Sequence, residues 1–80
     1  MRLDKFLKVS RIIKRRTVAK DIAENERVMI NGRMAKASTD VKKGDIFSIR
    51  IGERETTYEI LEIQENVKAA DAKTLYRIQE

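Results

Sequence analysis

The chain has 80 residues, contains neither cysteine nor histidine, and carries a formal net charge of +5 at pH 7. This length suits a single domain and leaves no room for a catalytic domain beside a binding domain. The missing cysteine excludes a disulfide framework and thiol chemistry, and the missing histidine removes the usual general base and the commonest transition-metal ligand. We therefore expect one domain over residues 1–80 that is not an enzyme and holds no metal, cofactor or small-molecule substrate.

Charge is divided unevenly along the chain. Residues 1–44 contain thirteen lysines or arginines against five acids, whereas residues 45–80 contain five against eight. A compact fold of such a chain has one strongly positive side, which attracts polyanions in a salt-dependent manner. An ordinary solvated surface is the alternative, but scattered charge would not separate by half in this way.

Apolar residues form no long run. The longest uninterrupted apolar stretch is the three residues Val28 to Ile30, far below the length of a membrane span or of a signal peptide's apolar core. A cytoplasmic protein is expected.

The first predicted element is an amphipathic helix. Leu3, Phe6 and Leu7 recur at helical spacing, which predicts a helix from about Arg2 to Val9. A basic loop at residues 14–16 follows it.

A second helix is predicted after this loop. Thr17 is expected to be its N-cap, because a threonine hydroxyl can accept a hydrogen bond from an exposed backbone N–H. Asn25 is expected to end the helix in the left-handed conformation. The buried stripe of this helix is predicted to consist of Val18, Ala19, Ile22 and Ala23.

The rest of the chain predicts a small antiparallel sheet. Asn31 and Gly32 are typical of a two-residue hairpin turn, in which both central residues need positive φ. Further turns are expected at residues 42–45 and 52–55, and a short helical turn at 68–73. Strands are expected over residues 28–30, 34–37, 47–51, 57–63 and 75–78. The predicted fold class is α+β, with two N-terminal helices packed on the sheet.

Eight cations lie among the first twenty residues, with Asp4 as the only acid. Helical spacing brings many of them together where the two helices meet, and such an array matches the phosphates of RNA. The N-terminus of the second helix adds free N–H groups. For single members, above all Lys8 and Lys20, the alternative is that they only keep the helices soluble. The eight cations are Arg2, Lys5, Lys8, Arg11, Lys14, Arg15, Arg16 and Lys20.

Asp4 is predicted to orient a neighbouring arginine or to complement the helix dipole. A single carboxylate without histidine, cysteine or a paired acid makes a poor reaction centre. The four aromatic residues are interleaved with apolar ones, so they are predicted to lie mainly in the core rather than to stack bases. They are Phe6, Phe47, Tyr58 and Tyr76. Recognition of the shape and backbone of folded RNA is therefore favoured.

Four motifs in order across residues 2–45 resemble the RNA-binding domain named after ribosomal protein S4. They are the segments Arg2–Leu7 (RLDKFL), Arg15–Lys20 (RRTVAK), Val28–Gly32 (VMING) and Val41–Asp45 (VKKGD). The resemblance implies an S4-like (αL) fold with its core motif in residues 2–50 and an extension over residues 51–80. Residues 1–17 and the overall length further resemble the heat shock protein 15 group, and within it the short bacterial ribosome quality-control factors of the RqcP type.

This resemblance implies binding to large ribosomal subunits obstructed by peptidyl-tRNA. Such a factor contacts 23S rRNA and tRNA, holds the tRNA in the P site and supports C-terminal alanine tailing by an RqcH-type partner. The implied RNA-contacting residues are Arg2, Lys5, Arg11, Arg15, Arg16 and Lys20, with Asp4 and Thr17 shaping the surface and with Asn31 and Lys36 as weaker candidates. One departure is Asn25-Glu26, where many relatives have glycine near the helix end.

Three alternatives stay open. A factor of the same fold that binds another structured RNA, such as a ribosome biogenesis factor, is the main competitor. Membrane association through the basic first helix is disfavoured, because its apolar stripe is short and lacks tryptophan. An enzyme is disfavoured by the missing catalytic residue types. The chain is expected to act as a monomer.

Overall fold

The computed structural model of the protein describes residues 1–79 as two α-helices, one 3-10 helix and a five-stranded antiparallel sheet. Helix α1 spans Leu3–Val9 and α2 spans Arg16–Glu24. The strands lie in the order β2-β1-β3-β4-β5. Their bounds are β1 Val28–Ile30, β2 Arg33–Met34, β3 Ile46–Ile51, β4 Arg54–Ile60 and β5 Tyr76–Gln79, and the 3-10 helix η1 covers Ala69–Leu75. The predicted α+β class is confirmed.

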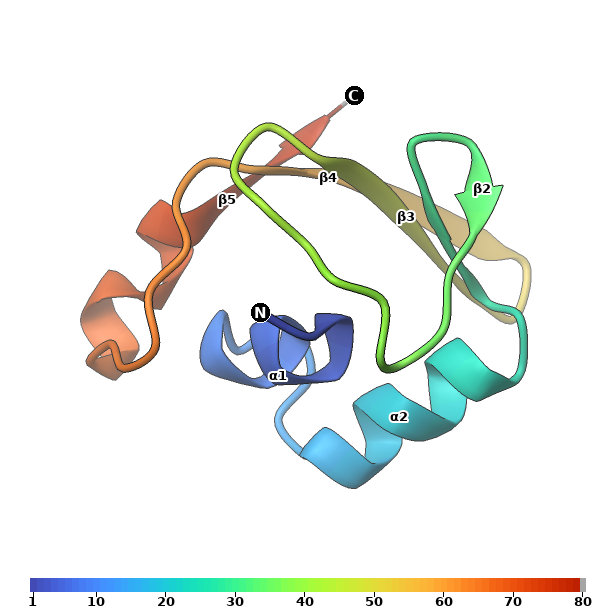
Figure 1. Cartoon of the computed structure of the whole chain (residues 1–80), viewed down its shortest axis with the longest axis horizontal. Coiled ribbons are helices and arrows are strands. Elements are labelled where there is room, and N and C mark those ends of the chain that lie inside the picture. The colour runs from blue at the N-terminus through green and yellow to red at the C-terminus, as the bar shows by residue number, and fades with distance from the viewer. Residues whose placement is uncertain (80) are drawn as a thin grey trace.

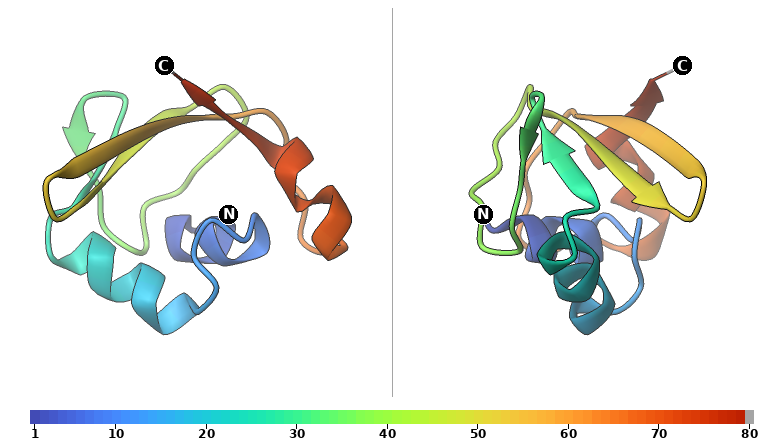
Figure 2. Two further views of the ribbon diagram at one scale, coloured as in Figure 1. Left: turned by 180° about the vertical axis from the view of Figure 1, so that it is seen from behind. Right: turned by 90° about the vertical axis from the view of Figure 1, so that its right-hand side faces the viewer.

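The sheet arches over α1, and α2 lies below α1 on the same side of the sheet (Figure 1; Figure 2 shows the arch from two further directions). Alternate residues of β3 point into this concave side, where Phe47 and Ile49 are buried against the helices. Ile51, at the end of the same strand, is exposed. Apolar burial between the sheet and the helices supplies the main stabilisation of so small a domain.

The predicted Asn31-Gly32 turn is confirmed. Asn31 has φ 49° and Gly32 has φ 82°, as this turn requires, and Ile30 pairs with Arg33 directly across it. Strand β2 ends at Met34 and not at residue 37 as predicted. The N–H of Ala35 still bonds to the carbonyl of Val28 at 2.9 Å, and over residues 37–41 the chain bonds to residues 1–4 instead of to the sheet.

Residues 37–41 run alongside the start of α1. The N–H of Leu3 donates to the carbonyl of Thr39 at 2.8 Å, and the N–H of Asp4 donates to the carbonyl of Ala37 at 3.1 Å. The first N–H groups of a helix have no partner within the helix. The 37–41 segment thus satisfies two of them and fixes the position of a helix that is only seven residues long.

Helix α2 begins one residue before the predicted N-cap, so the prediction for Thr17 is wrong. Arg15 has the extended conformation of an N-cap (φ −116°, ψ 129°), and its carbonyl accepts the N–H of Ala19 at 3.1 Å. Only the alanines of the predicted stripe are fully buried. Val18 is 44% exposed, because α2 approaches α1 closely on its small residues, Ala19 and Ala23.

The end of α2 also differs from the prediction. Asn25 has φ −95°, whereas the left-handed residue is Glu26 with φ 60°. The N–H of Glu26 bonds to the carbonyl of Ala23, and the N–H of Arg27 to that of Ile22. These two bonds form a Schellman motif with glutamate in the usual glycine position. Asn25 contributes through its side chain, whose Nδ2 donates to the carbonyl of Asp21 at 2.7 Å.

The C-terminal strands are displaced from their predicted bounds. Strand β4 starts at Arg54 because Gly52, with φ 62°, allows a two-residue turn after Ile51. It ends at Ile60 and not at 63, and the next N–H groups bond to the carbonyl of Leu75. A short helical segment and a last strand follow, as predicted. They are η1 and β5, and their bounds lie one to two residues later than the predicted ones.

The aromatic residues pack in or at the edge of the core, as predicted, and their rings contact one another in series. Phe6 meets Phe47 edge-on with ring centroids 6.0 Å apart, and Phe47 stacks on Tyr58 at 5.1 Å. Tyr58 in turn meets Tyr76 edge-on at 5.5 Å. The phenylalanines are buried and the tyrosines half-buried at the edge of the core. Across residues 1–79, no helix is both long and apolar enough to cross a membrane.

Candidate nucleic-acid interface

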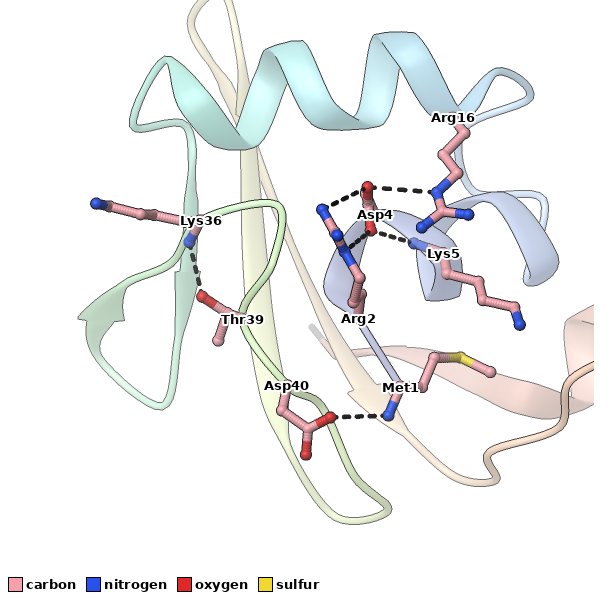
Figure 3. Close-up of polar contacts among 8 residues, drawn as sticks. All are labelled: Met1, Arg2, Asp4, Lys5, Arg16, Lys36, Thr39 and Asp40. Carbon is pink, nitrogen blue, oxygen red and sulfur yellow. Dashed lines mark hydrogen bonds and ion pairs between the residues drawn. The ribbon is translucent and has the colours of Figure 1, made fainter.

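The carboxylate of Asp4 lies between two arginines (Figure 3). Arg2 donates from Nε to Oδ1 at 3.2 Å and from Nη2 to Oδ2 at 3.4 Å, and Arg16 donates from Nε to Oδ2 at 3.3 Å. The backbone N–H of Lys5 also donates to Oδ1 at 2.9 Å. The predicted role of Asp4, to orient a neighbouring arginine, is confirmed, and it extends to a second arginine.

Burial differs sharply between the partners of this Arg2–Asp4–Arg16 cluster. The side chain of Asp4 is 3% exposed, whereas those of Arg2 and Arg16 are 50% and 45% exposed. A guanidinium has five N–H donors, so each arginine holds Asp4 with part of its donors and presents the others to solvent. The cluster therefore displays two oriented guanidinium groups on the surface, which is the geometry that binds phosphate oxygens in a bidentate manner.

The fold explains why residues twelve positions apart meet. Asp4 stands in the first turn of α1, whose start is held by the 37–41 segment. The close packing of α2 on α1 through its buried alanines then brings Arg16, the first residue of α2, to the same carboxylate. One buried negative charge lets two positive charges approach each other with less repulsion.

The other predicted cations are distributed over a wider surface. Arg15, the N-cap of α2, and Lys20, within α2, are both exposed. Lys5 points away from Asp4 (Figure 3), and its Nζ forms an ion pair with Glu65. This hydrogen bond and the charge of Lys5 lower the pKa of Glu65 below its ordinary value. Sequence reasoning did not include Glu65, because the pair joins residues sixty positions apart and no local pattern marks it.

Arg11 lies apart from the Asp4 cluster. It follows the C-terminal end of α1 with φ 60°, and its side chain lines a separate cleft together with Lys8 and Lys14. Lys8 and Val9 place this cleft at the last turn of α1, whereas Asp4 stands in the first turn.

The two weaker candidates differ in how their side chains are used. Asn31 bonds within the fold: its Nδ2 donates to Oδ1 of Asp45 at 3.2 Å and its Oδ1 accepts the N–H of Ile46 at 3.0 Å. Lys36 is exposed and its side chain extends away from the cluster (Figure 3). Within the part of the chain that the structure describes, no three histidine, cysteine or acidic side chains gather as a metal site would need.

Comparison with known proteins places these features in a family. Residues 1–47 match the S4 domain. The chain is 54% identical to the RQC P-site tRNA stabilizing factor of Halalkalibacterium halodurans and 51% identical to that of Bacillus subtilis. Each match covers 98% of this chain, and it covers 89% of the first relative and 91% of the second.

A solved structure agrees with these relatives. The trimeric structure of Vibrio cholerae heat shock protein 15 matches with a TM-score of 0.88 and 36% identity, over 99% of this chain and 81% of that one. The expected S4-like fold is thereby confirmed over both the matched motif and the C-terminal strands. The chain therefore belongs to the S4 domain family and, within its heat shock protein 15 group, to the RqcP-like proteins.

Proposed function

We propose that this protein is a non-catalytic RNA-binding factor of ribosome-associated quality control. It binds rRNA and peptidyl-tRNA on obstructed large ribosomal subunits, stabilises the tRNA in the P site and supports C-terminal alanine tailing by an RqcH-type factor in the cytoplasm. The observation that carries this proposal is the Arg2–Asp4–Arg16 cluster, in which a buried carboxylate orients two half-exposed guanidinium groups. The names of the relatives from Halalkalibacterium halodurans and Bacillus subtilis support the P-site tRNA as target.

The cluster binds through phosphates. A phosphate between the two guanidinium groups accepts charge-assisted hydrogen bonds from donors that Asp4 has already oriented, so little side-chain freedom is lost on binding. The start of α2 adds positive potential beside Arg16. Contacts to phosphates position the protein on folded RNA without reading bases, which suits the junction of 23S rRNA and tRNA.

The proposed RNA-contacting set extends beyond the cluster. Thr17, in the first turn of α2, shapes the surface beside Arg16. Asn31 and Lys36 contribute less, and for Asn31 the reason is that its amide is already bonded to Asp45. In this proposal the protein acts as a monomer, and one chain supplies all three members of the cluster. The RNA-contacting residues are Arg2, Lys5, Arg11, Arg15, Arg16 and Lys20.

A second candidate is a factor that binds another structured RNA, such as a ribosome biogenesis factor. The same cluster is compatible with this candidate, because guanidinium groups that bind phosphates do not distinguish one RNA sequence from another. The two candidates differ in the particle that the protein accompanies.

Sedimentation of the tagged protein from lysate through a sucrose gradient separates these candidates. We expect the protein to migrate with free large subunits that carry peptidyl-tRNA. The R2A/R16A variant should leave this fraction, since each substitution weakens binding by about 1–3 kcal/mol. The matched control is R50A/K73A, which also removes two exposed cations, both outside residues 1–47.

Each outcome of the gradient has one meaning. Loss of co-migration in R2A/R16A alone, with a native circular dichroism spectrum, supports the proposed function. Migration with empty or immature subunits supports the second candidate. A wild-type protein that stays at the top of the gradient contradicts both.

A further inference from the structure

A cleft with a basic lining lies at the C-terminal end of α1. Lys8, Arg11 and Lys14 line one side of it, and residues 65–67 form the other. This second wall belongs to the segment that joins β4 to η1 and descends beside α1 (Figure 1). The cleft has a volume of about 240 Å³. Because a water molecule occupies about 30 Å³ in the liquid, the space suits a group several times larger than water.

The charge of this α1–loop cleft is unbalanced. None of the side chains of Lys8, Arg11 and Lys14 forms an ion pair with a carboxylate of residues 1–79. The one acid in the lining is Glu65, and its carboxylate is engaged by Lys5. Three cations thus face one concavity without a counter-charge, and a cleft lined by one sign of charge concentrates the field on an incoming anion.

Each wall has contacts that anchor it, and for residues 65–67 these are the packing of Val67 and the ion pair of Glu65 with Lys5. The N–H groups of Leu61 and Glu62 bond to the carbonyl of Leu75 at 2.8 and 3.3 Å, and Val67 packs against the core. On the other side, the left-handed Arg11 is fixed by the bond from its N–H to the carbonyl of Lys8 at 3.0 Å. A preformed site loses less conformational freedom when it binds a ligand.

The lining indicates which anion fits. It contains no aromatic ring, so a base has nothing to stack on. Two half-buried valines, Val9 and Val67, provide a small apolar surface beside the cations, and the amide of Asn66 offers a donor and an acceptor. Cations suit a phosphate, the valines suit the carbons of a sugar, and an amide suits a ribose hydroxyl.

We propose that the α1–loop cleft is a second RNA site, which holds one sugar–phosphate unit of an RNA backbone at the opposite end of α1 from the Arg2–Asp4–Arg16 cluster. This proposal rests on the proposed RNA-binding function. It gives Lys8, Lys14 and Asn66 a direct contact with RNA, and it gives the segment between β4 and η1 a part in binding.

The first test measures binding of the full chain to purified large subunits that carry peptidyl-tRNA, over a series of salt concentrations. In K8Q/R11Q/K14Q, the slope of log affinity against log salt should fall by about one, the value for the loss of a single phosphate contact. Affinity at 0.1 M salt should fall about five- to eightfold for each lost phosphate contact. The control R50Q/R54Q/K73Q removes three exposed cations elsewhere and should bind like the wild type. An unchanged affinity and slope in K8Q/R11Q/K14Q overturns the cleft, while loss of binding in R2A/R16A alone leaves the proposed function standing.

A second test needs no ribosome. The backbone amides of residues 65–67 and the Asn66 side chain are followed by ¹⁵N NMR during titration with a ten-nucleotide oligouridine, with inorganic phosphate and with decaglutamate. We expect saturable shifts with the oligouridine only, and their loss in N66D, which places an acid in the cleft. Equal shifts with phosphate or decaglutamate would identify a general anion site and overturn the assignment to RNA, as would absent shifts with oligouridine.

Discussion

Asp4 is an acid at the centre of a basic surface, and its burial explains this position. Its carboxylate accepts hydrogen bonds from two guanidinium groups and one backbone N–H. It therefore acts on the two arginines as a positioning residue. The sequence predicts this role, because Asp4 is the only acid among eight cations. It does not single out Arg16 as a partner, since that contact depends on how α2 packs on α1.

Replacement of Asp4 by asparagine distinguishes two effects on RNA binding: the orientation of the two arginines and the net charge of the protein. D4N raises the net charge by one, so simple attraction predicts tighter RNA binding. We expect weaker binding to large subunits, because Arg2 and Arg16 lose the carboxylate that orients them. The free energy of unfolding should fall by about 1–2 kcal/mol in urea, since charge-assisted hydrogen bonds are lost.

The matched control for this change is D21N on the exposed face of α2. It raises the net charge by the same amount without touching the cluster, so RNA binding should stay equal or tighten slightly. If D4N and D21N tightened binding to the same degree, Asp4 would have no positioning role.

Among the elements, α2 differs from its predicted form in both its ends and its buried face. The sequence correctly predicts its existence and approximate length, because threonine, alanine and apolar spacing are strong local signals. It misplaces the ends and the buried face. Val18 is larger and more apolar than the alanines, yet it is exposed, since the close approach of two helices favours small residues. Packing between the helices, and not the local sequence, therefore determines which residues of α2 are buried.

The Schellman motif at the end of α2 provides a stability prediction. Glu26 adopts φ 60°, a conformation that disfavours a residue with a Cβ by about 1 kcal/mol relative to glycine. E26G should therefore raise the free energy of unfolding by about 0.5–1 kcal/mol and the midpoint of thermal unfolding by a few degrees. E26Q removes the same charge but keeps the Cβ, so it should leave stability nearly unchanged. Equal stabilisation by both variants would attribute the effect to charge.

At the scale of the whole molecule, the cations of the first twenty residues divide between two places. The sequence predicts one continuous basic surface. The structure places Arg2 and Arg16 around Asp4, and Lys8, Arg11 and Lys14 at the far end of α1. The opposite wall of the cleft that the second group lines comes from residues 65–67, some fifty positions later in the chain. Contacts of this range leave no periodic signal in the sequence.

The core also predicts how stability depends on pH. Burial raises the pKa of Tyr58, the neighbouring Tyr76 adds to this effect, and a hydrogen bond with Thr56 opposes it. A raised pKa means that the folded state holds the phenolic proton more tightly than the unfolded state. The contribution is therefore fully present below about pH 10, the unperturbed tyrosine pKa, and is lost as pH rises through the folded pKa.

Urea unfolding of the wild type and of Y58F from pH 7 to pH 11 measures this contribution. The difference between the two proteins should be constant up to about pH 9.5. Above pH 10 the wild type should lose stability relative to Y58F, which has no proton to release at this position. A difference that stays constant to pH 11 would show that Tyr58 does not titrate differently in the folded state.

The bonds between residues 37–41 and the start of α1 have a consequence for synthesis. A helix of seven residues is marginal by itself in water, and two of its first N–H groups find their acceptors only at Ala37 and Thr39. Chains are made from the N-terminus, so the basic segment leaves its own ribosome as an extended, highly charged polymer. The residues around Asp4 are thus translated before residues 37–41, and they are set in place only after that segment has followed them.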